Sequence, residues 1–397
     1  MQSITQIDEN NERPRIALIS LFGLDLGLRY ISSFLQHKGY SVSIIFFNKI
    51  RYSVGFLSND YITAPLSPRD ACPENDIRLL IKKLQSLNPS IIGMSVGSAT
   101  VPVAIKITRE IKKISKAVIV WGGPHAIAAP EECIRVADVV CMGEGEYPMF
   151  ELAERLRRKE PLTHIRGLWV KLGSHSEKNE LNDLITNLDA LPFPDFIRRD
   201  NKCTIFEGET SGDVHIHSSG HMYMYPLMTS RGCKYACSYC SNSVFRERFK
   251  GKGPFLRRRS VSNVIEELKA VIRQRQVLGV RFWDDVFTYD EAWVDEFCER
   301  YSGEVGLPFF CYAHPHKEIK RILKKLRQAG LCWVDMGVQS GSERIVSTVY
   351  ARKQNNQEIL ELAAYLNKLG IIAYYDFIVD NPCGHSPETG ARSAFLG

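Results

Sequence analysis

The sequence predicts an α/β protein in two parts, a doubly wound parallel sheet followed by a partial β/α barrel. Two observations support this fold class. Short apolar runs alternate with segments of helical periodicity, and this alternation occurs twice along the 397-residue chain. Strands that are buried on both faces read as continuous apolar runs. A regular alternation of such strands with helices indicates a parallel sheet.

The first series of elements follows a polar arm at residues 1–13 and extends over residues 14–173. Its apolar runs predict strands at residues 15–20, 42–47, 91–96, 117–121 and 138–142. Helical spacing of apolar residues predicts helices at residues 27–39, 76–86, 101–115, from about 130, and 147–158. Residues 53–75 have mixed polarity and three prolines, so we expect an excursion there.

The composition changes at residues 174–225, where short polar pieces and a turn-rich stretch predict a linker or domain junction. A second series begins at residue 226, with strands expected at 227–230, 280–284, 309–312, 333–338 and 373–379. Helices are expected between them, at 262–276, 290–301, 317–328 and 356–368. This order is typical of a β/α barrel, and five strands are visible within residues 226–397.

Composition and charge exclude several classes of protein. The chain is 44% hydrophobic and 24% charged, as globular proteins are, and its net charge of +6 is mild for a general polyanion binder. We therefore expect no nucleic-acid partner. Eleven cysteines, an odd number, argue against a secreted disulfide framework. Without a signal peptide or an apolar run of about 18–20 residues, we expect a cytoplasmic protein with no membrane span.

Three closely spaced cysteines, Cys233, Cys237 and Cys240, follow the first predicted strand of the second series. The loops at the carboxyl ends of barrel strands carry the active site in β/α barrels. Three close thiolates suit a soft metal centre, whereas a zinc site normally requires a fourth Cys or His. Three ligands on a 4Fe–4S cluster leave one iron open. The spacing alone leaves a cluster, a zinc site and unrelated cysteines as interpretations.

This C-x3-C-x2-C motif, with an aromatic residue before its third cysteine, resembles that of the radical S-adenosylmethionine (radical SAM) superfamily. Further segments resemble family signatures in the family order, at residues 257–260, 282–288 and 337–344. The resemblance implies that the cysteines hold a 4Fe–4S cluster whose open iron binds S-adenosylmethionine, with Tyr239 against the adenine. Family barrels usually have six strands, so it also implies a (β/α)6 barrel truncated after about five.

Polar residues at the ends of predicted strands are candidates for binding S-adenosylmethionine. Asp284 and Asp285 end the second strand, where carboxylates can accept bonds from the ammonium group; a helix N-cap pair is the alternative. In relatives the position of Gln339 often reaches the ribose or the methionyl group, and Ser340 follows it. Many relatives have Glu there, and a polar cap on a buried strand is the alternative.

Glycine-containing motifs follow the strands of the first series, at residues 27–30, 92–95, 122–125 and 143–146. Ligands of open α/β sheets lie beyond the carboxyl ends of the strands, and glycines there allow close approach of the backbone. Plain turn chemistry is the alternative. Ahead of a radical SAM barrel, these motifs resemble a Rossmann-like cobalamin-binding domain. The resemblance implies seven contact residues: Gly27, Ser95, Gly122, Gly123, His125, Gly143 and Glu144.

The D-x-H-x-x-G motif, whose histidine ligates cobalt from below in several mutases and methyltransferases, does not occur in the sequence. The resemblance to the radical SAM subclass therefore implies cobalamin without a protein lower ligand. His125 is expected in a loop near the corrin, with direct ligation as the alternative. An unligated lower face would make the cobalt easier to reduce.

Three other features have weaker interpretations. The basic stretch at residues 246–259 could bind RNA phosphates, a phosphorylated substrate or the corrinoid tail, or it could be a solvated loop. The histidines His215, His217 and His221 could hold a metal, but a solvent-facing or interdomain segment is preferred. The scattered cysteines are expected to be buried structural thiols.

Together these resemblances imply an enzyme that reductively cleaves S-adenosylmethionine to a 5′-deoxyadenosyl radical. We expect it to methylate an unactivated carbon of a small-molecule or lipid-like substrate, with an external one-electron reductant such as a flavodoxin or ferredoxin. The alternatives are an oxidative or ring-forming enzyme with the same cofactors, a tRNA methylthiotransferase, and a non-catalytic corrinoid-binding module. The identity of the substrate does not follow from the sequence.

Overall fold

The computed structural model describes residues 13–21, 25–47, 73–196, 198, 200–206, 208–213 and 224–378. The chain forms two compact units. The first contains Met1–Ile185 and Ala190–Ser219, and the second contains Thr186–Asp189 and Gly220–Gly397. Some sequence predictions concern residues outside the described ranges. These are most of the polar arm, the excursion up to residue 72, the three clustered histidines, and the stretch after residue 378.

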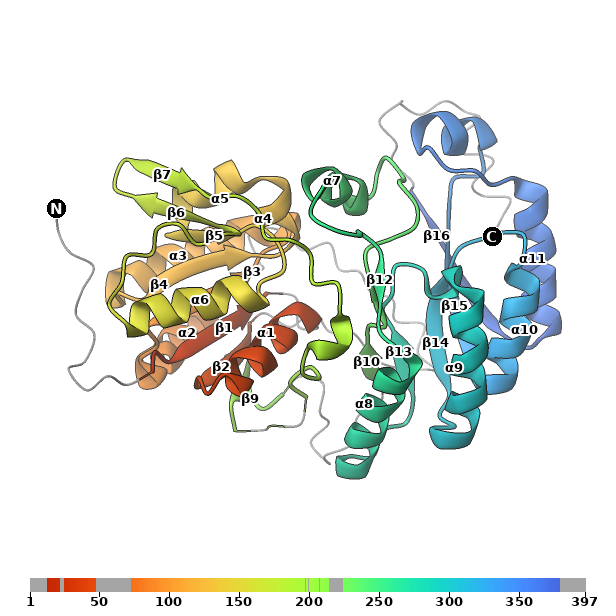
Figure 1. Ribbon diagram of the computed structural model, residues 1–397, viewed down its shortest axis with the longest axis horizontal. Helices are drawn as coiled ribbons and strands as arrows, with labels where there is room; N and C mark the ends of the chain where they lie inside the picture. The colour runs from red at the N-terminus through yellow and green to blue at the C-terminus, as the bar shows by residue number, and fades with distance from the viewer. Residues whose placement is uncertain are drawn as a thin grey trace. The chain divides into compact units, whose positions relative to one another are not determined.

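The first unit is built on a nine-stranded mixed sheet (Figure 1). Its central strands are parallel, in the order β5 (Val139–Cys141), β4 (Val118–Gly122), β3 (Ile91–Ser95), β1 (Ile16–Ser20), β2 (Val42–Phe47) and β8 (Lys202–Phe206). Antiparallel strands extend both edges: β6 (Leu168–Leu172) and β7 (His175–Lys178) beside β5, and β9 (Glu209–Ser211) beside β8.

Helices cover both faces of this sheet, as a doubly wound fold requires. Helices α1 (Leu26–His37) and α6 (Glu146–Arg157) pack with Ile16 and Leu18 of β1. On the other face, α2 (Glu74–Leu87) and α3 (Val101–Ile114) pack with Ala17 and Ile19. Alternate residues of one strand thus contribute to two cores. Short helices α4 (Pro124–Ala128) and α5 (Pro130–Val136) follow β4.

The segment 174–225, predicted to be a linker, contains three strands of the first sheet. Strands β7 and β9 lie at the two edges and are short and polar, which hides them from a search for apolar runs. Strand β8 is mostly buried although it begins with Lys202, whose ammonium group is held by Asp195 at 2.7 Å. The expected all-parallel sheet is therefore mixed. Helix α4 was not predicted either.

The second unit contains a five-stranded parallel sheet in the order β10 (Tyr225–Leu227), β13 (Val280–Phe282), β14 (Phe309–Ala313), β15 (Leu331–Gln339) and β16 (Ile372–Phe377). Four helices lie along one side of it in Figure 1: α8 (Val261–Gln274), α9 (Glu291–Glu304), α10 (Ile319–Ala329) and α11 (Asn356–Lys368). The predicted alternation of strands and helices is confirmed in this range. Truncation of the barrel stays a prediction.

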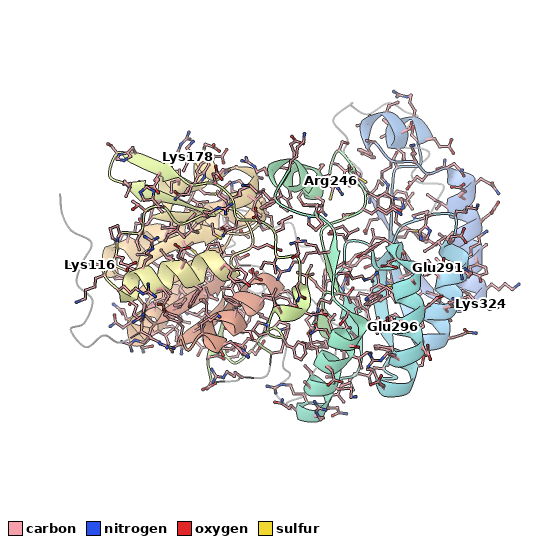
Figure 2. All side chains as sticks on the ribbon, in the orientation of Figure 1. Lys116, Lys178, Arg246, Glu291, Glu296 and Lys324 are labelled. Carbon is pink, nitrogen blue, oxygen red and sulfur yellow. The ribbon has the colours of Figure 1, made fainter. Side chains whose placement is uncertain are left out.

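These helices are amphipathic, which fixes how they lie on the sheet. Phe297 of α9 is fully buried against Phe282 and Phe309 of the sheet. Glu296 of α9 and Lys324 of α10 point outward from the ribbon in Figure 2. The first predicted strand of this unit is displaced. It ends at Leu227, and residues 230–231 belong to a separate two-stranded antiparallel sheet, β11 (Ser230–Arg231) with β12 (Arg257–Arg258).

A buried arginine joins α1 to the end of the first unit. The guanidinium of Arg29 donates to both carboxylate oxygens of Asp213, at 2.7 and 2.8 Å, and to the carbonyl oxygen of Asp195 at 2.8 Å. It also lies between the rings of Phe196 and Phe46, at 4.0 and 4.7 Å from their centroids. Arg29 comes from one of the glycine-containing motifs, and its contacts are those of a structural residue.

Replacing Arg29 should lower the free energy of unfolding of the first unit. Arg29→Met leaves the Asp213 carboxylate buried without its partner, which costs about 3–5 kcal/mol in comparable pairs. We expect that loss in the first transition of urea unfolding. The matched control is Lys113→Met, which removes an exposed pair with Glu110 and should cost below about 1 kcal/mol. If Arg29→Met lowers the unfolding free energy no more than Lys113→Met does, the Arg29–Asp213 pair contributes little to the stability of the first unit.

Candidate active site

The three predicted ligand cysteines lie on one loop between β11 and helix α7 (Ser241–Arg248). All three thiols are free and half-buried. The loop begins at Gly232, where φ is +85° and an added Cβ would lie 2.2 Å from the carbonyl oxygen of Phe255. Only glycine fits this turn without displacing the backbone. The loop follows β10, at the carboxyl end of the parallel sheet.

The three sulfur atoms influence one another. Burial raises the pKa of Cys233 to about 11, and the negative charges of Asp285, Cys240 and Cys237 add to the rise. Such thiols lose their protons when they bind a metal. Within the described residues, no three His, Cys, Asp or Glu side chains converge on one ion position. A 4Fe–4S cluster does not require such convergence, because each thiolate binds a different iron.

Contacts with the region after β15 hold the cysteine loop in place. The amide of Ser238 donates to the carbonyl oxygen of Tyr350 at 3.2 Å. Buried Arg352 donates to the Tyr239 hydroxyl and to the carbonyl oxygen of Gly337, both at 2.8 Å. Arg352 therefore connects the loop to the strand end that carries the predicted cofactor residues. Sequence reasoning missed it, because it lies outside every motif.

On another side of the loop, Tyr235 stacks on His314, with ring centroids 3.8 Å apart. His314 follows β14 and is buried. Burial lowers its pKa to about 4, and Arg352 adds to the effect. Its Nδ1 lies 2.7 Å from the carbonyl oxygen of Pro315, so we assign the proton to Nδ1. A neutral imidazole ring thus supports the loop beside the cysteines.

Several arginines of the basic stretch at residues 246–259 make internal contacts. Arg246, labelled in Figure 2, donates to the carbonyl oxygens of Cys233 and Tyr235 and so braces the cysteine loop. Arg258 lies over the ring of Trp293 at 3.6 Å, and Arg259 pairs with buried Glu267 at 2.5 Å. The interpretation as a solvated loop is therefore wrong for these three arginines.

Asp284 and Asp285 have different surroundings. Asp284 is fully buried and accepts hydrogen bonds from the Thr229 amide at 3.1 Å, the Thr229 hydroxyl at 2.7 Å and the Ser230 hydroxyl at 2.5 Å. It holds the start of the segment that leads to the cysteines. Asp285 is exposed as a residue and lies beside the loop, where desolvation of its carboxyl raises the pKa and Asn242 donates a hydrogen bond to it. Only Asp285 is placed to meet a ligand of the cysteine loop.

The other residues predicted to bind S-adenosylmethionine lie around the same edge. Tyr239 is 40% exposed, and its ring packs edge-on against Tyr350 at 5.1 Å. Gln339 ends β15 at a register shift, with φ at +69°. Ser340 is buried, and its hydroxyl accepts from the Ser342 amide at 3.2 Å. Their roles stay predictions.

In the first unit, several predicted residues gather at the carboxyl ends of β3 and β4. Ser95 and Gly122 are the last residues of these strands. Gly123 has φ at +91°, and an added Cβ would lie 2.9 Å from the Val96 nitrogen and 3.1 Å from the Ser95 hydroxyl oxygen. His125 was expected in a loop but lies in the short helix α4, with its Nδ1 3.0 Å from the Ser98 hydroxyl. This edge has a glycine where the resemblance implies close approach of a ligand.

The remaining residues predicted to contact cobalamin, Gly27, Gly143 and Glu144, lie outside the ends of β3 and β4. Gly27 is an exposed residue in the first turn of α1. Gly143 and Glu144 follow β5, and one Glu144 oxygen accepts from the Ile185 amide at 2.7 Å. Glu144 thus fastens a neighbouring segment. Sequence reasoning missed Asp25, whose carboxyl hydrogen-bonds with the hydroxyls of Ser95 and Ser20; a carboxylate just before Gly27 was the available signal.

The scattered cysteines within the described residues are free, as expected for structural thiols. Four are buried and two are half-buried: Cys133, Cys141, Cys203, Cys311, Cys298 and Cys332. Burial raises the pKa of Cys141 and of Cys298 to about 12. These thiols are protonated at neutral pH and lack the reactive character of a thiolate.

Comparisons with known families match both units. Residues 13–153 match the B12 binding domain, and residues 227–390 match the radical SAM superfamily. The chain therefore combines a B12-binding domain with a radical SAM domain, as its motifs predict. Radical SAM proteins bind a 4Fe–4S cluster and S-adenosylmethionine, so these two cofactors and cobalamin belong to this combination. No helix among the described residues is long and apolar enough to cross a membrane.

Three curated proteins are similar to most of the chain. An uncharacterized methyltransferase of Pyrococcus horikoshii is 27% identical over 327 residues, covering 81% of this chain and 66% of that protein. Cytidylyl-2-hydroxyethylphosphonate methyltransferase of Streptomyces wedmorensis is 26% identical, covering 92% and 70%. An anaerobic magnesium-protoporphyrin IX monomethyl ester cyclase of Cereibacter sphaeroides is 24% identical, covering 80% and 51%. The chain thus spans about half to two thirds of these relatives.

Two solved structures show the same fold. The cobalamin-dependent S-adenosylmethionine radical enzyme OxsB, with aqua-cobalamin and S-adenosylmethionine bound, has a TM-score of 0.72 and 19% identity, covering 98% of this chain and 52% of that one. The radical S-adenosylmethionine methyltransferase TsrM of Kitasatospora setae has a TM-score of 0.69 and 16% identity, covering 96% and 70%. At these identities the likeness concerns the fold alone.

The two neighbouring aspartates can be separated by experiment. Asp284→Ala leaves buried donors of Thr229 and Ser230 without an acceptor, which should lower the unfolding free energy by at least about 2 kcal/mol and reduce iron retention. Asp285→Asn should keep the iron content and raise the Kd for S-adenosylmethionine about tenfold. Iron analysis, urea unfolding and equilibrium dialysis would measure these effects. Equal loss of iron in both variants would contradict the division of roles.

Proposed function

We propose that this chain is the cofactor-binding part of a cobalamin-dependent radical SAM methyltransferase. The observation that carries the proposal is the loop of Cys233, Cys237 and Cys240, with three free thiols at the carboxyl end of a parallel sheet, in a chain that also has a B12-binding domain. The relatives named as methyltransferases support this outcome. Methylation of an unactivated carbon of a small molecule or lipid-like substrate is the specific reaction proposed.

The residues present fit the implied cofactors. Three half-buried thiols on one loop are a donor set for three irons of a 4Fe–4S cluster. When bound, the cluster would supply the electron that cleaves S-adenosylmethionine, and cobalamin would supply the methyl group. An external one-electron reductant of the flavodoxin or ferredoxin class would be required. The glycine edge beyond β4 is the proposed approach of the corrin.

The protein side chains hold and orient these groups. Arg352 fixes the Tyr239 hydroxyl, which sets the orientation of the ring proposed to stack on adenine. Asp285 is proposed to accept a hydrogen bond from the ammonium group of S-adenosylmethionine, which would favour its charged form. Asp284 keeps the strand end and the cysteine segment together. Positioning by such contacts is the main task of a protein in cofactor chemistry.

A second candidate is a radical reaction without methyl transfer. The similarity to a protein named as a cyclase favours it, because that relative covers 80% of this chain. The two candidates differ in their coproducts. Methyl transfer releases S-adenosylhomocysteine and leaves the methyl group in the product, whereas the alternative releases 5′-deoxyadenosine and methionine without S-adenosylhomocysteine.

Anaerobic assay of the reconstituted full chain should test the proposal. With a strong reductant and methyl-deuterated S-adenosylmethionine, wild-type protein should form 5′-deoxyadenosine, and Cys237→Ala should lose this activity by at least about a hundredfold, or about 2.7 kcal/mol. Liquid chromatography with mass spectrometry measures the product.

Cys298→Ala is the matched control, because that half-buried cysteine lies away from the loop and should keep wild-type turnover. Normal 5′-deoxyadenosine formation by Cys237→Ala would refute the proposed cluster ligation. In assays that contain substrate, S-adenosylhomocysteine and deuterated product would identify methyl transfer. Their absence beside continued 5′-deoxyadenosine formation would favour the cyclase-like alternative.

A further inference from the structure

A half-buried aspartate with one buried carboxylate oxygen lies at the carboxyl end of the first unit's central strand. Asp25 stands between β1 and α1, with φ at +25° and ψ at +65°. This region of backbone conformation is uncommon for residues other than glycine. Asp25 occupies the N-cap position of α1, and the backbone amide of Leu28 in the first turn hydrogen-bonds with its carboxyl, as in a helix cap.

The two oxygens of Asp25 differ in their contacts. The carboxyl group hydrogen-bonds with the hydroxyls of Ser20, the last residue of β1, and Ser95, the last residue of β3. Its Oδ2 is buried and has no hydrogen-bond partner among the residues that the structure describes. A buried acceptor without a partner is costly, so natural proteins seldom keep one without a reason.

The nearby positive charge does not satisfy this oxygen. Arg29, one turn later in α1, directs both terminal nitrogens of its guanidinium to Asp213 and to the Asp195 carbonyl. Arg29 acts on Asp25 only as a weak electrostatic influence, the smallest of those that lower its pKa. The other groups that face the carboxyl are neutral hydroxyls and a backbone amide.

The position of Asp25 indicates what could satisfy it. Ligands of open α/β sheets bind beyond the carboxyl ends of the strands, where β1 and β3 both end beside Asp25. Gly123, with its left-handed backbone, lies against the Ser95 hydroxyl that Asp25 contacts. The carboxyl is thus part of the edge at which the proposed function places the corrinoid.

We infer that Asp25 is a corrinoid-binding residue, whose Oδ2 accepts a hydrogen bond from an N–H or O–H donor of the bound corrinoid. Two groups of a corrinoid supply such donors, the side-chain amides of its ring and water on the cobalt. The inference rests on the proposed function, since it requires that the first unit binds a corrinoid. It adds a polar contact to a set of predicted residues that consists mainly of glycines.

Ionisation of Asp25 links this role to stability. Burial raises the pKa of Asp25 from 3.8 to about 6. A carboxyl whose pKa is higher in the folded state than in the unfolded state destabilises the fold once it is ionised. In the corrinoid-free protein this penalty begins near pH 4, grows as the pH rises to about 6 and is complete above that. A donor from the corrinoid would remove part of it.

The test uses the full chain, with Asp25→Asn and Asp25→Leu as variants and Asp183→Asn as the matched control. Asp183 is an exposed carboxylate of the same unit. Absorbance titration would measure binding of diaquacobinamide and of dicyanocobinamide, which carries no water on cobalt. Thermal unfolding of the corrinoid-free proteins at pH 5 and pH 8 is the second measurement, and it does not depend on catalysis.

We expect Asp25→Leu to weaken corrinoid binding about tenfold and Asp25→Asn to weaken it less. We also expect Asp25→Asn to raise the corrinoid-free Tm at pH 8, with a smaller change at pH 5. Loss of affinity for both cobinamides identifies an amide as the donor, and loss for the diaqua form alone identifies water on cobalt. Asp183→Asn should match wild type throughout.

Three outcomes would overturn the inference. Unchanged affinity of both variants, with wild type binding normally, would contradict it and leave the proposed function intact. A fall in both affinity and corrinoid-free stability of Asp25→Asn at pH 8 would assign Asp25 a purely structural role. Failure of wild type to bind either cobinamide would contradict corrinoid binding itself, and the role of Asp25 with it.

Discussion

Parallel strand pairing is the constraint on which both candidate sites depend. A parallel pair cannot be closed by a tight turn, so each strand is followed by a crossover, and all strand ends meet at one edge. In the second unit this places the loops after β10, β13, β14 and β15 together. Tyr235 can therefore stack on His314 although the two are far apart in sequence. The same constraint brings Ser20 and Ser95 beside Asp25 in the first unit.

Several buried charged groups in these two units have an oppositely charged or hydrogen-bonding partner, and Asp25 differs from them in one of its oxygens. Arg29 has a bidentate carboxylate and a carbonyl oxygen, and Arg259 has Glu267. Asp284 has three donor groups around it. A charge buried without such partners costs several kcal/mol. Among the described residues Asp25 keeps a buried oxygen without a hydrogen-bond partner, and it lies at the sheet edge proposed to bind the corrinoid rather than inside a core.

Much of the fold was predictable because its strands are apolar on both faces. The run 42–47 gives β2 without error, and the five strands of the second unit appear in the predicted order. Strands β7 and β9 were not predicted because edge strands carry polar residues. Strand β8 was not predicted because it begins with Lys202, whose charge is buried in an ion pair that the sequence does not reveal. The cysteine motif identifies the site, but Arg352 is invisible in sequence since its importance comes from a tertiary contact.

A motif can mark a family without marking which of its residues meet the ligand. Asp284 and Asp285 are neighbours with the same functional group, yet in the loop after β13, which ends at Phe282, they have different surroundings. The Asp284 carboxylate accepts hydrogen bonds from Thr229 and Ser230, whereas the Asp285 carboxylate faces the cysteine loop. The segment 257–260 behaves likewise, since its arginines make internal contacts. Recognising the motif therefore predicts the location of the site, while burial and hydrogen bonding decide which residues are scaffold.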